Sequence, residues 1–337
     1  MDYPGEKFLI RLLDIIERNG ISPFVDSWKT RRDGMAAIDV QRAQALMLAQ
    51  VEVEIARLKS DGLAIPNEAD TQSAPRLGAP GSVISDGALG NTAGLAKEAF
   101  TYEAVRSLRR EANVGKAIAR AAEALLECDG APPQAEPDPD WLERWRDNAS
   151  GVASEKMQDL WGQVLAREVQ QPGSLSLRAM DLLRNLDSSD AARIERLALF
   201  VLDNRFVYKN PDSSGNGLSF AEAMALQELG ILAGVDSGFL VFTLDSVSES
   251  EFVRGITLGK YGIGLRASDP EISVSLDGYK VTSVGREILT LVDVEPDRAY
   301  LEEVASAIKL KGVTVHFGTA EPLVGEGGFN LNDPIEL

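Results

Sequence analysis

The chain has 337 residues, 44% hydrophobic and 26% charged, which is a balance typical of globular proteins with two or three domains. It carries 52 acidic and 34 basic residues, a net charge of −18, and residues 1–127 hold only 18 acidic and 16 basic ones; residues 128–337 therefore carry −16. This field repels phosphate groups, so the composition argues against general nucleic-acid or anionic-membrane binding by the C-terminal part.

The N-terminus is predicted to begin with a short amphipathic helix over residues 6–18. Its apolar residues recur at helical spacing, and Asn19-Gly20 provides a stop. Because its polar face mixes acids with bases, we favour packing in a core or on a partner over contact with a membrane surface. No signal-peptide core is present, and no run approaches the roughly 20 apolar residues that span a bilayer. We therefore expect a soluble, cytoplasmic protein.

Two longer helices are expected over residues 35–59 and about 95–127. Between them, residues 61–93 are rich in Gly, Ala, Ser and Pro and are expected to be disordered. The second helix carries a seam of mostly small residues at heptad spacing. The neighbour of this seam is either the first long helix folded back or the same helix of a second copy, so a homo-oligomer is expected. These candidate self-association residues are Val105, Leu108, Ala112, Gly115, Ala119, Ala122 and Leu126.

A Pro-rich acidic linker over residues 129–140 is predicted to separate the N-terminal arm, residues 1–128, from a central helical module over residues 141–210. Within the module, one helix is expected to end at Pro172-Gly173, and Ser174 is expected to cap the next.

Polar residues near the Pro172-Gly173 turn are candidates for binding a protein partner. A glutamate and arginines beside helix N-terminal amides can recognise a carboxylate or a phosphate. The favoured alternative is structural: Glu168 and Arg178 pair across a helical hairpin, and the serines cap. The candidate partner-binding residues are Gln163, Arg167, Glu168, Ser176 and Arg178.

This region resembles the bacterial family catalogued as domain of unknown function 2806. The similarity covers roughly residues 140–235 and rests on WLERW, a tryptophan-bearing helix, the turn P-G-S-x-S-L-R and the later LQELGIL. The matching positions are Met157, Gln158, Leu160, Trp161, Gly162, Leu165, Ala166, Glu168, Pro172, Gly173, Ser174, Ser176, Leu177 and Arg178. The resemblance implies a bacterial, cytoplasmic protein and suggests a mobile-element or phage-defence context, but it supplies no catalytic residue.

The C-terminal part, residues 211–320, is predicted to be a winged-helix-like α+β domain. A capping box at Ser219 opens a helix, residues 239–244 are expected to form a buried strand, and Asp277-Gly278 is expected to turn a hairpin. No Lys or Arg lies between Ser219 and Leu232, which disfavours direct DNA readout. The tail, residues 321–337, is expected to be mobile.

The sequence carries no motif that identifies an enzyme. Neither a P-loop nor G-x-G-x-x-G is present, and Gly255, Gly259, Gly262 and Gly264 are interpreted as turns and a bulge. The single cysteine, Cys128, and the single histidine, His316, leave no disulfide and no Cys/His zinc set, and His316 is interpreted as a structural strand residue. No catalytic, cofactor-binding or metal-binding residue is predicted.

The expected fold is therefore mainly α with a smaller α+β part: long N-terminal helices, a central helical module and a winged-helix-like C-terminal domain. The favoured function is a non-enzymatic interaction or regulatory protein that self-associates through helices and binds a protein partner. Two alternatives stay open. One is a metal-dependent hydrolase or nuclease with unidentified carboxylates, and the other is a winged-helix transcription regulator.

Overall fold

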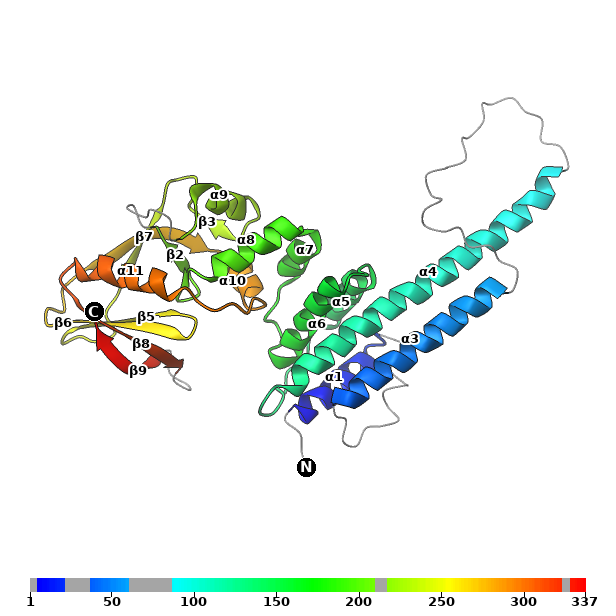
Figure 1. Cartoon of the computed structure of the whole chain (residues 1–337), viewed down its shortest axis with the longest axis horizontal. Helices are drawn as coiled ribbons and strands as arrows, with labels where there is room; N and C mark the ends of the chain where they lie inside the picture. The colour runs from blue at the N-terminus through cyan, green and yellow to red at the C-terminus, as the bar shows by residue number, and fades with distance from the viewer. Residues whose placement is uncertain (1–4, 22–36, 61–86, 210–216, 323–327) are drawn as a thin grey trace, which may run out of the picture. The chain divides into compact units, whose positions relative to one another are not determined.

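The computed structural model describes residues 5–21, 37–60, 87–209, 217–322 and 328–337, and the chain divides into two compact units (Figure 1). Met1–Ser174 form the first unit, which is helical, and Leu175–Leu337 form the second, which combines helices with two antiparallel sheets. A helical unit followed by an α+β unit agrees with the fold class predicted from the sequence. The division falls after Ser174 instead of within residues 129–140, so the expected central module is shared between the units.

The first unit is built around a 40-residue helix, α4 (Gly87–Leu126). The helix α3 (Ala37–Ser60) packs against α4, so these two long helices pair within one chain (Figure 1). Because α4 begins at Gly87, the last part of the predicted linker is helical, while residues 61–86 lie outside the described residues.

The first helix, α1 (Glu6–Arg18), buries the apolar face that the sequence places on it. Phe8, Leu12 and Ile16 are among its buried residues, and α1 contacts α4 and α6 within the unit. The basic side chains of its polar face reach the Pro-rich segment, where Glu136 Oε1 lies 3.0 Å from Arg11 and 2.7 Å from Arg18. The apolar face is thus occupied by core packing.

Two further helices, α5 (Pro139–Ser150) and α6 (Glu155–Gln170), pack on α4. Helix α6 approaches α4 closely at Gly162, where an added Cβ would meet Arg120 Cβ at 2.4 Å and Ala117 O at 3.0 Å. Trp145 and Trp161 are fully buried beside this crossing, and the Trp145 indole donates a hydrogen bond of 2.8 Å to the Trp161 carbonyl. These tryptophans are core residues of the first unit.

The second unit starts with α7 (Leu177–Asn185) and α8 (Ser188–Ala198), followed by a sheet centred on β7 (Val274–Val281). β2 (Phe206–Tyr208) pairs with β7 on one side and with β1 (Val201–Leu202) on the other. β3 (Leu232–Ala233) and β4 (Leu240–Leu244) also pair with β7. The capped helices α9 (Phe220–Glu228) and α10 (Ser283–Leu289) complete this part.

The hairpin predicted at Asp277-Gly278 is wrong, because β7 runs through both residues as one strand. Gly278 pairs with Tyr208 on one side and with Leu240 on the other. A Cβ at this position would lie 2.4 Å from the Val207 carbonyl oxygen, so the glycine permits close strand packing and makes no turn. The winged-helix prediction used this hairpin as its wing, so the structure does not confirm that part of the prediction.

The strand β4 forms where the sequence places it, but it is not buried. Leu240 and Val241 are 37% and 60% exposed, and only Leu244 in this strand is buried. The continuous apolar run was interpreted as a sign of burial on both faces, whereas β4 pairs with β7 alone among the described strands.

The second sheet has the order β5-β6-β8-β9 and consists of β5 (Phe252–Leu258), β6 (Tyr261–Ala267), β8 (Thr314–Pro322) and β9 (Phe329–Glu336). Helix α11 (Arg298–Lys309) packs on it through buried apolar residues. The C-terminal tail, expected to be mobile, instead supplies β9, which pairs with β8 across a register shift between Phe317 and Thr319. Residues 323–327 lie outside the described residues.

Candidate binding site

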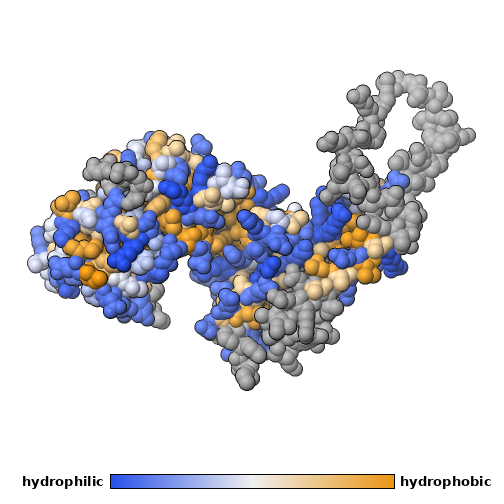
Figure 2. Space-filling model, in the orientation of Figure 1, coloured by the Kyte–Doolittle hydropathy of each residue, from blue (hydrophilic) through white to orange (hydrophobic). Residues whose placement is uncertain are grey.

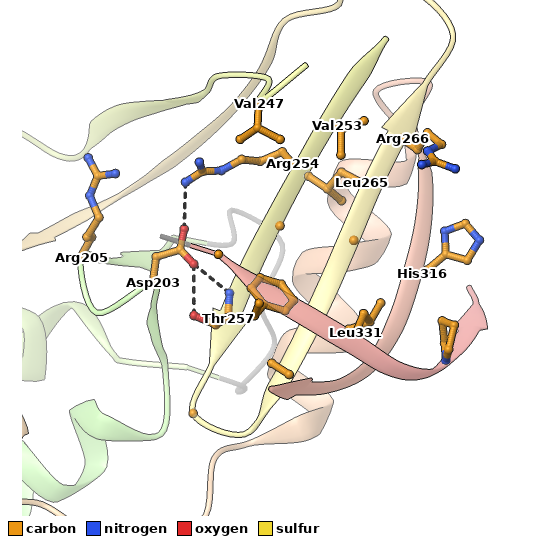
Figure 3. A pocket seen from close by; sticks show the side chains of 17 residues that line it. Asp203, Arg205, Val247, Val253, Arg254, Thr257, Leu265, Arg266, His316 and Leu331 are labelled. Carbon is orange, nitrogen blue, oxygen red and sulfur yellow. Dashed lines mark hydrogen bonds and ion pairs between the residues drawn. The ribbon is translucent and has the colours of Figure 1, made fainter. Parts of the chain in front are cut away.

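A pocket of about 920 Å³ lies on the second sheet, on the side opposite the residues that α11 covers (Figure 3). We call it the sheet pocket. Strands β5, β6, β8 and β9 line it, together with the turn that joins β1 to β2 and the segment that precedes β5. It lies entirely within the second unit. Its volume is in the range of pockets that hold drug-sized ligands.

Glycines form the floor of the sheet pocket. Gly255 on β5 and Gly264 on β6 are register partners, and Gly262 lies two residues before Gly264. The ring of Phe329, from β9, lies against this floor, since a Cβ at Gly255 or Gly262 would come within 2.7 Å of its ring atoms. Only Gly259 of the four glycines occupies a turn, so the interpretation of the other three as turns or bulges is wrong.

A carboxylate fixes one end of the pocket. Asp203 has a positive φ of 51° in the three-residue turn between β1 and β2, which points its backbone and side chain at β5. Asp203 Oδ1 accepts hydrogen bonds from the Thr257 amide at 2.8 Å and the Thr257 hydroxyl at 3.3 Å, and Oδ2 pairs with Arg254 Nη2 at 3.3 Å (Figure 3). The carboxylate is therefore engaged on both oxygens.

Three arginines and a histidine surround the rest of the pocket, although the surrounding chain is strongly acidic. Arg205 is exposed and has no ion pair among the described residues. Arg266 lies 3.6 Å from Glu251, and both side chains are exposed enough for water to screen their attraction. Arg254 is half-buried, and its Nε has no hydrogen-bond partner within the described ranges. His316 lines the far side from β8 (Figure 3).

This arrangement suits binding better than proton transfer. Asp203 is the sole carboxylate in the described lining, and its oxygens already accept hydrogen bonds. The pocket instead offers guanidinium donors beside apolar side chains, namely Val247, Val253, Phe329, Leu331 and Pro334. Guanidinium groups with apolar neighbours recognise carboxylates or phosphates attached to a partly apolar ligand.

The sequence did not identify this site. Asp203, Arg205, Arg254 and Arg266 are each separate in the chain and carry no motif. One local signal was present: Asp203-Asn204-Arg205 separates two short apolar runs, a pattern typical of a short hairpin loop. His316 was assigned correctly to a strand, but its position in the pocket wall was not predicted.

The candidate partner-binding residues fall in two different units, so they do not form one described site. In the first unit, Gln163 is exposed, Arg167 is partly buried and Glu168 is 1% exposed. The Glu168 carboxylate accepts a hydrogen bond from the Gly173 amide at 2.6 Å and lies 3.5 Å from the Ser174 hydroxyl. Glu168 thus holds the turn after α6, and Ser174 does not cap the next helix.

In the second unit, Ser176 is the N-cap of α7. Its hydroxyl accepts a hydrogen bond from the Ala179 amide at 3.3 Å, and its own amide donates to Glu287 of α10 at 2.7 Å. Arg178 is exposed on the first turn of α7. The helix begins at Leu177, two residues later than a cap at Ser174 implies. Ser176 therefore has the capping role that the structural alternative predicts.

The seven candidate self-association residues lie in α4, and most are buried within the first unit. Val105, Ala112, Ala119 and Ala122 are each at most 7% exposed, while Leu108 and Leu126 are partly buried. The seam is therefore occupied by packing inside the chain. Other apolar side chains of α3 and α4 reach the surface, among them Phe100 at 77% and Val53 at 67% exposure. Figure 2 shows apolar surface along these two helices. Self-association stays a prediction.

A family model described as protein of unknown function (DUF2806) matches residues 102–305. The chain belongs to this family. The DUF2806 match includes the part of α4 that packs on α6, and it extends through Asp203, Arg205, Arg254 and Arg266 of the sheet pocket. Strands β8 and β9, with His316 and Phe329, follow the matched region.

No curated protein and no solved structure matches the chain. Among the described residues, no group of His, Cys, Asp and Glu side chains is arranged to hold a metal ion. The described helices include none with the length and apolar character needed to cross a bilayer.

Proposed function

We propose that this DUF2806 protein is a non-enzymatic interaction protein that binds a protein partner in the sheet pocket of its second unit. The observation that carries the proposal is the composition of the lining: arginines and apolar side chains face the pocket, and its carboxylate is already engaged by Thr257 and Arg254. A site of this kind offers charge and shape for recognition, and it offers no pair of groups poised for acid and base catalysis.

Gly264 provides a way to close the pocket without disturbing its walls. A Cβ at this position would find only Leu331 Cδ2, at 3.5 Å, which is ordinary van der Waals contact. Gly264→Ala should therefore be tolerated, whereas Gly264→Phe places a ring over the floor between β5 and β8. Both variants keep the charge of the pocket.

The test is purification of the tagged full-length protein from its own cells, with identification of bound proteins by mass spectrometry. We expect a stoichiometric partner with the wild type and with Gly264→Ala, and loss of that partner with Gly264→Phe at an unchanged melting temperature. A partner retained by Gly264→Phe, or a wild-type protein that carries no partner, would refute the proposal.

The winged-helix regulator remains a prediction with less support. α9 carries Glu222 and Glu228 and no basic residue, which is unsuited to a helix in the DNA major groove. No described carboxylate cluster favours the metal-dependent hydrolase over the interaction protein.

A further inference from the structure

One residue of the edge strand β5 has backbone groups that pair with no other described residue. Val253 donates its amide to the Ser246 hydroxyl at 3.0 Å and accepts from the Val247 amide at 2.8 Å. Thr257 donates its amide to Asp203 Oδ1 at 2.8 Å and accepts from the Asp203 amide at 2.9 Å. Both residues thus direct their backbone groups away from β6.

Gly255 lies midway between these two residues. Backbone groups along a strand alternate sides with a period of two residues, so the Gly255 amide and carbonyl also point away from β6. Neither group has a partner among the described residues outside the β5–β6 ladder, and Gly255 lines the sheet pocket. The outer edge of β5 is therefore hydrogen-bonded within the fold at Val253 and at Thr257, and between them Gly255 offers one donor and one acceptor.

Arginines lie near both ends of this edge. Arg205 is in the turn that hydrogen-bonds to Thr257, Arg254 is on β5 itself, and Arg266 on β6 is the register partner of Val253 (Figure 3). Val253 and Thr257 are four residues apart on β5, which corresponds to about 13 Å of extended chain. Apolar side chains, including Val253 and Leu331, line the intervening space.

Building on the proposed function, we infer that the sheet pocket binds an extended acidic segment of the partner protein. One carboxylate of the segment lies against Arg205, and a second, about four residues away, lies toward Arg266. The residues between them are apolar, and one of them pairs its own amide and carbonyl with the Gly255 carbonyl and amide. The strongly negative field of residues 128–337 elsewhere repels such a segment, so the cationic pocket determines where it docks.

The backbone of Gly255 favours a peptide over a small anion. A phosphate or a free carboxylate uses the amide donor but leaves the carbonyl without a partner, whereas one residue of an extended peptide satisfies both groups with its own carbonyl and amide. The apolar lining points the same way, because a highly charged oligophosphate gains nothing from Val253 or Leu331.

The test begins with selection of a displayed library of random seven-residue peptides on the purified full-length protein at low salt. Selected peptides are then synthesised, and their Kd values are measured by fluorescence anisotropy with the wild type and three variants. Arg205→Gln and Arg266→Gln each remove one charge from the pocket. Arg184→Gln is the matched control, since Arg184 is exposed on α7 in the same unit and does not line the pocket.

We expect selected peptides with Asp or Glu at two positions about four residues apart and aliphatic residues between them. Arg205→Gln and Arg266→Gln should each raise Kd about tenfold, because each removes a charge-assisted hydrogen bond, whereas Arg184→Gln should leave Kd unchanged. N-methylation of the central peptide amide should weaken binding similarly. Selected peptides without acidic enrichment, equal Kd values for all variants, or displacement by pyrophosphate at concentrations equal to the peptide would overturn the inference.

Failure of this inference is distinguishable from failure of the proposed function. A partner that is lost with Gly264→Phe but binds equally well to Arg205→Gln and Arg266→Gln would sustain the proposed pocket and exclude the acidic segment. A partner that Gly264→Phe retains would overturn both.

Discussion

Glu168 is a buried carboxylate whose partners are the backbone and side chain of the turn that follows its helix. It is 1% exposed and holds the Gly173 amide at 2.6 Å. We predict that Glu168→Ala lowers the free energy of unfolding by about 1–3 kcal/mol, because the substitution removes the carboxylate that accepts a charge-assisted hydrogen bond from the Gly173 amide. Urea unfolding monitored by tryptophan fluorescence measures this change.

Arg178 is the control for that measurement, since it is exposed on α7. Arg178→Ala should change the free energy of unfolding by no more than about 0.5 kcal/mol. A Glu168→Ala variant as stable as the wild type would contradict the structural role assigned to this carboxylate and restore it as a candidate contact for a partner.

Residues with a local role were predictable, and residues with a role set by tertiary structure were not. The capping box of Ser219 and Glu222 formed as the local pattern indicates. The three arginines of the pocket were missed because Arg205 comes from a turn and Arg254 and Arg266 come from two strands, and only the packing of the turn on those paired strands brings them to one surface. No spacing rule within the sequence encodes that proximity.

At the scale of a single element, β7 shows how close packing overrides a turn signal. Asp277-Gly278 between alternating apolar residues is typical of a hairpin, yet the residues continue a central strand. The reason is the absence of a side chain at Gly278, which lets the Val207 carbonyl approach. Periodicity identified the strand residues correctly, but it did not distinguish a turn glycine from a packing glycine.

A substitution at this glycine tests that explanation. Gly278→Ala places a Cβ 2.4 Å from the Val207 carbonyl oxygen, so β2 and β7 have to separate. We predict a loss of about 1–3 kcal/mol in the free energy of unfolding, as in other overpacked cores. Ser275→Ala on the same strand, where the side chain is only partly buried, should cost less than about 0.5 kcal/mol. Equal stability of the two variants, measured by thermal denaturation, would refute the packing role of Gly278.

At the scale of the whole molecule, composition and helical periodicity predicted helices followed by an α+β part, but they did not place the division. The Pro-rich segment looked like a boundary, yet α5 and α6 after it pack on α4 before it. The close packing of α6 on α4 depends on Gly162 and on small residues of α4, including Ala117. The sequence does not show that these residues face one another. The Pro-rich composition therefore marks a linker between helices, but it does not indicate which of those helices share a core.

Two units with separate cores should unfold as two cooperative transitions, and substitutions should affect only the unit that contains them. Gly162→Ala introduces a Cβ 2.4 Å from Arg120 Cβ, so we predict that it weakens amide protection in α4 and α6 and leaves β2 and β7 unchanged. Gly278→Ala should have the converse effect. Hydrogen exchange followed by mass spectrometry resolves both regions in the intact chain. Gly151→Ala is the control in the first unit, because its Cβ would meet only Asn148 O at 3.6 Å. Loss of protection in both units with either core variant would mean that they unfold as one, and binding in the sheet pocket would then depend on the helices of the first unit.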